Sequence, residues 1–309
     1  MAKGREKVLV ALGGNALIRE HQLGKYAEQM RNVRRTCRLV AKIVKRGHDV
    51  IVTHGNGPQV GNLQVQMQAA KCRVPAMPLD VSGAMTQAQV GYMLQQALSN
   101  YIRGRDVATV ITQVEVDAHD SAFRNPTKPI GQFYSAREAK ALSRKFKMVE
   151  DAGRGWRRVV ASPRPKRIVE LPTIRKLSSA GAIVVACGGG GIPVVKGKEG
   201  YKGVEAVIDK DHASALLANS LGIKTMAILT GIEFVMVDYR KKSQRKLRGI
   251  HAKELRKYLR EGQFPEGSMK PKIEAALDFL SKGGKKVIIT SLNKLVEGLE
   301  GKTGTIITK

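Results

Sequence analysis

Two lysines and one aspartate have the side chains and positions needed to act together on a phosphoryl group. Lys210 and Asp211 are adjacent in GVEAVIDKDHASALLA, just before a helix that we expect over residues 213–219. Lys272 lies in the first turn of another expected helix, where a cation opposes the helix dipole and so favours an anionic partner. A lysine can face a phosphate while a neighbouring carboxylate holds that lysine in position. The alternative for Asp211 is a helix N-cap without a chemical role.

Lys128 is a third candidate cation, because NPTKPIG places it between two prolines. Proline restricts the backbone, which would aim the lysine at a fixed point. The alternative is a solvated surface lysine.

Glycine-bearing turns follow four of the expected strands, with the sequences GGNAL, HGNGPQVG, CGGGG and TGIE. In open α/β sheets ligands bind beyond the carboxyl ends of the strands, where backbone N–H groups can hold an anion. Four consecutive glycines indicate bare backbone beside a ligand, and we interpret that ligand as an anion, with phosphate the first choice. None of the four turns is a Walker A or dinucleotide-binding motif.

Short apolar runs, with helical patterns between them, indicate an α/β fold with an open, mostly parallel sheet. In QMRNVRRTCRLVAKIVKRG the apolar residues fall at helical spacing and Gly47 supplies a stop. The runs lie at residues 7–12, 49–53, 107–112, 182–186, 225–229, 286–290 and 305–308.

The stretch at about residues 115–167 departs from this alternation. It contains several prolines, many cations and the only tryptophan. Because proline does not suit central strands, we expect a lobe that projects from the sheet.

The composition excludes several classes of protein. No apolar run approaches the length of a membrane helix and no secretory signal opens the chain, so we expect a cytoplasmic protein without a membrane partner. The three cysteines, Cys37, Cys72 and Cys187, have no metal-binding or disulfide spacing, and we expect them to be small buried hydrophobic residues.

The charge is strongly basic, with 54 Lys and Arg against 26 Asp and Glu and a formal net charge of +28. Its densest run, residues 239–260, is open to three interpretations: steering of anionic substrates, a solvated face, or attachment to nucleic acid. Few residues are aromatic and no RNA-binding signature is present, so we expect nucleic acid to bind only non-specifically at low salt.

Segments along nearly the whole chain resemble the carbamate kinases of the amino acid kinase superfamily. They are LGGNAL, THGNGPQVGNL, PAMPLDVSGAMTQAQVGYML, NPTKPIGQFY, EDAGRGWRRVVASPRPKRIVE, CGGGGIPV, GVEAVIDKDHASALLA, GSMKPKIEAALDFL and EGKTGTIIT. NPTKPIG in particular resembles the protruding subdomain that separates carbamate kinases from acetylglutamate and uridylate kinases.

This resemblance implies a single amino acid kinase domain over residues 1–309, a three-layer αβα sandwich with a protruding subdomain at about residues 115–167. The N-terminal lobe, residues 1–215, would bind carbamate or carbamoyl phosphate, and the C-terminal lobe, residues 216–309, the nucleotide. The reaction would be the reversible conversion of ATP and carbamate to ADP and carbamoyl phosphate, with Mg²⁺ carried on the nucleotide. The resemblance also implies a homodimer. It leaves open whether the reaction generates ATP in arginine breakdown or makes carbamoyl phosphate.

Site residues follow from the resemblance position by position. Lys210 and Lys272 would neutralise charge, Asp211 would organise them, and Lys128 would close over the substrate. His54 is expected to be a loop contact, because carbamate is already an anion and needs no general base. The turns around the carbamate and the phosphoryl group would be Gly13, Gly14, Asn15, Gly55, Asn56, Gly57, Gly188, Gly189, Gly190 and Gly191. The nucleotide contacts would be Lys210, Thr230, Gly267, Ser268, Met269 and Lys272, and no residue is expected to bind a metal directly.

The chain departs from the family pattern after Leu229, where Gly231 and Glu233 replace two aspartates that face the nucleotide. This departure concerns the nucleotide contacts. Two alternatives to a carbamate kinase also stay open. One is another acid-group kinase of the same fold, such as an acetylglutamate-type kinase. The other is a basic nucleic-acid-binding protein on a former kinase fold.

Overall fold

The structure is a computed structural model, and it describes residues 5–19, 22–150 and 155–309. An eight-stranded sheet forms its centre, with the strand order β15-β17-β16-β12-β1-β2-β9-β3. These strands are β1 (Lys7–Leu12), β2 (Asp49–His54), β3 (Val107–Thr109), β9 (Ile183–Val185), β12 (Thr225–Thr230), β15 (Gly249–His251), β16 (Lys286–Ser291) and β17 (Thr305–Thr308). All neighbouring pairs are parallel except β16 and β17, so the predicted mostly parallel sheet is confirmed.

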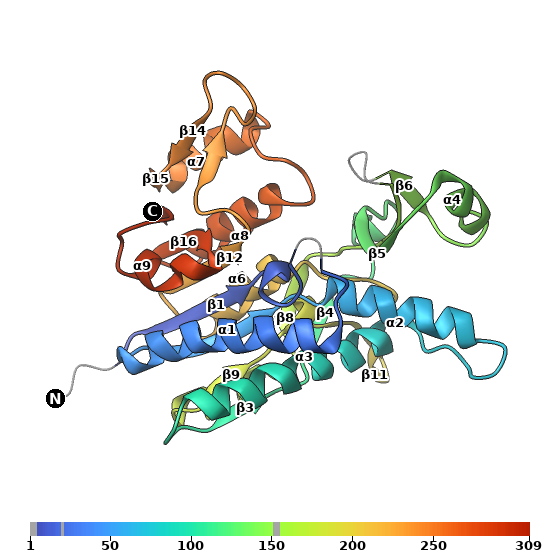
Figure 1. Ribbon diagram of the computed structural model, residues 1–309, viewed down its shortest axis with the longest axis horizontal. Helices are drawn as coiled ribbons and strands as arrows, with labels where there is room; N and C mark the ends of the chain where they lie inside the picture. Colours follow the sequence, from blue (N-terminus) through green and yellow to red (C-terminus); the bar gives the residue numbers. More distant parts are fainter. Residues whose placement is uncertain (1–4, 20–21, 151–154) are drawn as a thin grey trace.

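Helices cover both faces of this sheet, as Figure 1 shows, and form the predicted αβα sandwich. Within β1, Val8 and Val10 pack toward one face and Leu9 and Ala11 toward the other, and all four are fully buried. This two-sided burial explains why the strands read as unbroken apolar runs. One face is covered by α1 (Tyr26–Lys45), α3 (Leu79–Tyr101) and α9 (Leu295–Leu299), the other by α5 (Leu171–Ser179), α6 (Lys210–Ser220), α7 (Ala252–Arg260) and α8 (Met269–Ser281).

The helix predicted before Gly47 is α1, which buries Met30, Val33 and Cys37 on one stripe. Gly47 adopts a positive φ of 91° directly after the helix, which explains the stop. Cys37 and Cys187 are buried as expected, but Cys72 is exposed, so the expectation is wrong for that cysteine. Among the described residues, no helix has the length and apolar character to cross a membrane.

Two smaller sheets are built from the proline-rich stretch and its surroundings. One has the order β11-β10-β4-β8, from β4 (Gln113–Val116), β8 (Pro165–Ile168), β10 (Ile192–Gly197) and β11 (Gly200–Gly203). The other has the order β5-β7-β6, from β5 (Lys128–Tyr134), β6 (Met148–Glu150) and β7 (Trp156–Val160), and carries α4 (Ala136–Leu142). Pro129 is tolerated because β5 is an edge strand. We call β5, α4, β6 and β7 the projecting unit, which stands away from the main sheet in Figure 1.

The projecting unit rests on α2 (Gly57–Ala70). The two meet at Gly61 and Gly131, where a Cβ added to Gly61 would lie 2.1 Å from the Cα of Gly131. The family-like segment before β7 includes residues 151–154, which lie outside the described residues. A two-stranded sheet of β13 (Val235–Val237) and β14 (Arg245–Leu247) lies within the C-terminal part of the chain.

Candidate active site

Four neighbouring strands, β12, β1, β2 and β9, end at the same edge of the sheet. Their following turns hold Gly231, Gly13, Gly55 and Gly188, so the four glycine-bearing turns found in the sequence lie side by side. The amino end of α6 reaches the same edge, because the side chain of Lys210 passes 3.5 Å from the position of a Cβ on Gly55.

Asp211 gathers the two lysines predicted to act with it. Its Oδ1 lies 2.5 Å from the Nζ of Lys210 and its Oδ2 lies 3.0 Å from the Nζ of Lys272. Asp211 is only 2% exposed, so both oxygens make charge-assisted bonds away from water. One carboxylate thus fixes two ammonium groups, from α6 and α8, beside the strand ends.

The three groups shift one another's pKa values. Burial opposes the charge of Asp211, but Lys210 and Lys272 outweigh it and lower the pKa of this carboxyl. Burial lowers the pKa of the Lys210 ammonium, with Lys272 adding repulsion. Burial also opposes the charge of Lys272, but Asp211 outweighs it and raises the pKa of Lys272. Two cations and one anion leave an excess positive charge, which suits a phosphoryl group.

The cap of α6 is Asp209 rather than Asp211, because the helix begins at Lys210 and not at Ala213 as expected. The side chain of Asp209 accepts a hydrogen bond of 2.9 Å from the backbone N–H of Asp211. Its Oδ2 also lies 2.6 Å from the Nζ of Lys128, and this lysine lowers its pKa despite burial. Sequence reasoning missed Asp209, although the acid two residues before Asp211 was a visible signal.

Lys128 is therefore not a free surface cation. It is the first residue of β5, and its ion pair with Asp209 joins the projecting unit to the amino end of α6. The carboxylate of Asp209 binds the backbone of Asp211 and the side chain of Lys128. Because Asp211 in turn binds Lys210 and Lys272, all three predicted lysines are connected to the amino end of α6.

Protein groups crowd the glycine run, which gives a second reason for bare backbone beside the one inferred from the sequence. A Cβ on Gly188 would lie 2.4 Å from Nε2 of His54, and one on Gly190 would lie 2.2 Å from the carbonyl oxygen of Ile208. Gly189, Gly190 and Gly191 also have positive φ angles of 67°, 93° and 89°. Close packing and left-handed backbone account for these glycines, and their contact with an anion stays a prediction.

The residues of the two other predicted substrate turns differ in how crowded they are. Gly13 is crowded, since its Cβ would meet the carbonyl oxygen of Leu229 at 2.5 Å, whereas Gly14 has nothing within 4 Å and is exposed. Asn15 lies in the short 3-10 turn that follows. Asn56 is buried and donates to the hydroxyl of Thr86 at 2.8 Å, so its side chain supports the turn, and Gly57 opens α2.

His54 is a buried support of this region. Its Nδ1 lies 3.1 Å from the carbonyl oxygen of Gly55, and its Nε2 has no hydrogen-bond partner among the described residues. Burial lowers its pKa to about 4, with Lys210 contributing, so the ring is neutral near neutral pH. The position beneath Gly188 agrees with a loop contact.

The predicted nucleotide residues line two hollows. Thr230, Lys210 and Lys272 surround one of about 130 Å³, together with Gly13, Gly14, Ala16, Leu229, Gly231 and Leu292. Gly267 and Ser268 line a cleft of about 810 Å³ that Lys128 and Asp209 also border. Met269 packs against the core and does not line either hollow.

The departure at Glu233 has a structural counterpart, because its carboxylate accepts a hydrogen bond from the hydroxyl of Thr303. This bond ties the turn after β12 to the loop before β17. Gly231 lines the smaller hollow without a side chain. Among the described residues, no group of three or more His, Cys, Asp or Glu side chains could hold a metal ion.

Comparisons with known proteins agree on one family. The model of the amino acid kinase family matches residues 6–291. A carbamate kinase of Pyrococcus horikoshii is 50% identical over 311 residues, which cover 98% of this chain and 99% of that protein. A carbamate kinase of Pyrococcus furiosus is 51% identical over 308 residues, which cover 97% of this chain and 98% of that protein. A solved structure of the Giardia lamblia carbamate kinase bound to AMP-PNP superposes with a TM-score of 0.91 at 44% identity and covers 99% of both chains.

Proposed function

This chain belongs to the amino acid kinase family, among the carbamate kinases, and we propose that its lysine and aspartate cluster carries out the phosphoryl transfer. The reaction is the reversible conversion of ATP and carbamate to ADP and carbamoyl phosphate. The observation that carries the proposed site is Asp211, which holds Lys210 and Lys272 beside the ends of β12, β1 and β2.

The geometry suits phosphoryl transfer, which needs positioning and charge neutralisation more than covalent help. Lys210 and Lys272 would stabilise the charge that develops on the transferred group, while Asp211 holds them in place before the substrates arrive. Carbamate attacks as an anion, so no base has to remove a proton. The buried His54, which is neutral near neutral pH, is consistent with a reaction that needs no base.

Lys128 would act on the substrate from the projecting unit. In the structure its ammonium pairs with Asp209 at the border of the larger cleft. An entering carbamate or carbamoyl phosphate is an anion of the same kind as this carboxylate, so it could take over the ion pair. The exchange would turn the ammonium of Lys128 toward the reacting groups while the projecting unit stays on α2.

Mg²⁺ would be carried on the nucleotide phosphates. Asp209 and Asp211 are both engaged by lysines, which fits a metal that arrives with ATP. We place the enzyme in the cytoplasm and in arginine metabolism. Both directions, ATP generation and carbamoyl phosphate synthesis, would use the same groups.

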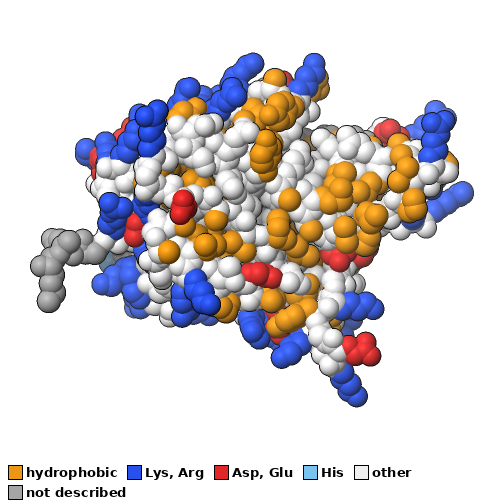
Figure 2. All heavy atoms as spheres, turned by 90° about the horizontal axis from the view of Figure 1, so that it is seen from below, with side chains coloured by type: hydrophobic (Ala, Val, Ile, Leu, Met, Phe, Trp, Pro, Cys, Tyr) orange, Lys and Arg blue, Asp and Glu red, His pale blue; other side chains and the backbone are white. Residues whose placement is uncertain are grey.

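We propose that the enzyme is a homodimer joined through the exposed face of α3. In a strongly basic chain, Asp80 is the one charged residue in the sequence of this 23-residue helix. Val81, Met85 and Tyr92 are 37%, 45% and 58% exposed along it, and Val74 and Met77 extend the patch. Figure 2 shows hydrophobic side chains gathered on this side, with Lys and Arg mainly around the margin. A second copy is the occupant we favour, because the repulsion between two chains of charge +28 is weakest where both surfaces lack charge.

The test of the reaction is ATP formation from ADP with Mg²⁺ and three competing donors: carbamoyl phosphate, acetyl phosphate and acetylglutamyl phosphate. We expect a clear preference for carbamoyl phosphate. A preference for acetylglutamyl phosphate would favour another acid-group kinase of this fold. No turnover with any donor, in a folded sample, would favour the nucleic-acid-binding alternative.

A further inference from the structure

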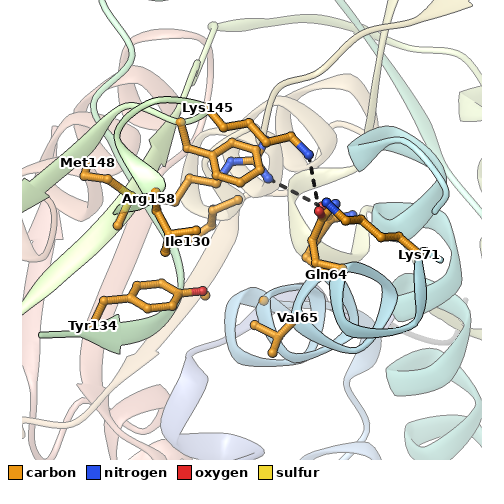
Figure 3. A pocket seen from close by; sticks show the side chains of 13 residues that line it. Gln64, Val65, Lys71, Ile130, Tyr134, Lys145, Met148 and Arg158 are labelled. Atoms are coloured by element: carbon orange, nitrogen blue, oxygen red, sulfur yellow. Dashed lines mark hydrogen bonds between the residues drawn. The ribbon is translucent and has the colours of Figure 1, made fainter. Parts of the chain in front are cut away.

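A separate pocket of about 310 Å³ lies between α2 and the projecting unit (Figure 3). Its walls are mostly apolar and come from both sides: Val65 from α2, and Ile130, Tyr134, Leu142, Phe146 and Met148 from the projecting unit. Figure 3 shows Ile130, Tyr134 and Met148 opposite Gln64, Val65 and Lys71. The size is within the range of about 300–1,000 Å³ that is typical of small-molecule sites.

The pocket is also cationic. Lys71, Lys145 and Arg158 line it, and no Asp or Glu does so among the described residues. The Nζ of Lys145 donates to Oε1 of Gln68 at 3.3 Å but makes no ion pair with a described residue. Arg158 lies 4.1 Å from the centre of the Phe146 ring and forms an ion pair with Glu205 at 3.5 Å, so the cations that lack a described ion-pair partner are Lys71 and Lys145. Apolar walls with unbalanced cations fit a ligand that has a compact apolar body and one negative charge.

The two elements that form the pocket also reach the candidate active site. β5 begins at Lys128, whose ammonium pairs with Asp209, and α2 begins at Gly57, in the turn after β2. The contact between Gly61 and Gly131 lies on the wall of the pocket. A molecule that touches both walls would favour the arrangement in which the projecting unit rests on α2, since it can bind fully only there.

We propose that this pocket binds a small amphipathic carboxylate, with an aromatic or branched apolar body, and that the bound ligand regulates the enzyme by holding the projecting unit on α2. Such a ligand would keep Lys128 at the border of the substrate cleft. The regulatory part rests on the proposed role of Lys128, whereas the binding part does not.

Calorimetric titration of the full chain with phenylacetate tests the binding, with phenylacetamide as the uncharged ligand of the same shape. We expect a Kd of about 1 mM or lower for phenylacetate and about fivefold or more weaker binding of phenylacetamide, as for the loss of one ion pair of about 1 kcal/mol. 4-Methylpentanoate in a parallel titration distinguishes a branched aliphatic body from an aromatic one.

Variants locate the site. Lys145→Gln should weaken phenylacetate about fivefold by removing a charge, and Val65→Trp should abolish binding by filling the space. Lys140→Gln is the matched control, because Lys140 lies on the exposed side of α4 and does not line the pocket. Lys145 is exposed, so its variant should fold normally even if Val65→Trp does not. Equal binding of phenylacetamide, or phenylacetate binding that Lys145→Gln leaves unchanged, would overturn the site.

The regulatory part is tested by the KM for carbamoyl phosphate with saturating phenylacetate. We expect the KM of the natural chain to fall about twofold or more. In Lys145→Gln the same fall in KM should require about fivefold more phenylacetate. A ligand that binds without changing KM or kcat would overturn regulation and leave the binding site standing. Because calorimetry needs no turnover, a failure of the proposed reaction could not be mistaken for a failure of the pocket.

Discussion

Asp211 is a buried carboxylate whose two oxygens bind two different lysines. This arrangement fixes the lysines before any substrate arrives, so the enzyme does not have to reorganise them during the reaction. It also makes the lysines the groups whose loss should matter most for the chemical step.

Lys210→Ala and Lys272→Ala should each lower kcat by about a hundredfold or more. Each removes a fixed positive charge that would otherwise stabilise the reacting phosphoryl group. His54→Gln should retain most of the maximal rate, since His54 is buried and neutral. Steady-state kinetics of ATP formation, with circular dichroism to confirm folding, checks this order. The reverse order would show that a base at position 54 is needed and that the proposed mechanism is wrong.

His54 should also make the protein sensitive to acid. Burial lowers its pKa from 6.5 to about 4, so between these values the unfolded chain binds a proton that the folded chain does not. The contribution of the neutral His54 to the free energy of unfolding is therefore complete above the pKa of the unfolded chain. It is lost as the pH falls to the pKa of the folded chain, and the loss is about 3 kcal/mol. Urea unfolding at about pH 7 and pH 4 should show a loss in the natural chain that exceeds the loss in His54→Gln by this amount. Equal losses would show that the histidine is already charged in the folded state.

At the scale of elements, the contact between α2 and β5 depends on two glycines. Gly61 and Gly83 both lie inside helices, but a Cβ on Gly61 would lie 2.1 Å from the Cα of Gly131, whereas one on Gly83 would have nothing within 4 Å. The same substitution therefore has opposite expected effects at these two positions.

Gly83→Ala should raise the free energy of unfolding by about 0.5–1 kcal/mol, because alanine favours the helical backbone. Gly61→Ala should lower it and should raise the KM for carbamoyl phosphate, since the added methyl group displaces β5 and with it Lys128. Chemical unfolding and steady-state kinetics measure the two effects. If Gly61→Ala behaved like Gly83→Ala, the projecting unit would not be held by this contact.

The helices and strands could be predicted from the sequence more fully than the contacts that explain individual residues. The strands were visible because burial on both faces leaves unbroken apolar runs, as in β1. The start of α6 was placed too late, because its cap, Asp209, was overlooked in favour of Asp211. The crowding of Gly188 by His54 and of Gly190 by Ile208 joins residues distant in sequence, so no local pattern could reveal it.

At the scale of the whole molecule, the uncharged face of α3 contrasts with the net charge of +28. Met85→Lys and Tyr92→Lys should each shift the protein from dimer to monomer at micromolar concentration, because each places a charge in the proposed interface. Analytical ultracentrifugation measures this, with Tyr239→Lys as the control at an exposed apolar residue elsewhere. A natural chain that sediments as a monomer, or variants that remain dimeric, would exclude this interface.

The net charge itself should produce non-specific binding to duplex DNA that disappears as salt rises. Counterion release makes the logarithm of the affinity fall linearly with the logarithm of the salt concentration, so we expect weak binding at about 20 mM salt and almost none at about 150 mM. Fluorescence anisotropy with labelled DNA checks this, and Lys241→Gln with Lys242→Gln should reduce the slope if the basic run makes the contact. Binding that persists at physiological salt would revive the nucleic-acid interpretation.

The position of β1 in the middle of the sheet has a consequence for biosynthesis. β1 pairs with β2 on one side and with β12, at residues 225–230, on the other. As the chain leaves the ribosome, the first pairing can form early, but the second edge stays open until most of the protein has been made. An open apolar strand edge invites association with other nascent chains, and its distant partner gives the fold a high contact order. We therefore expect slow folding and a dependence on chaperones, and the four turns of the active site come together only at the end of synthesis.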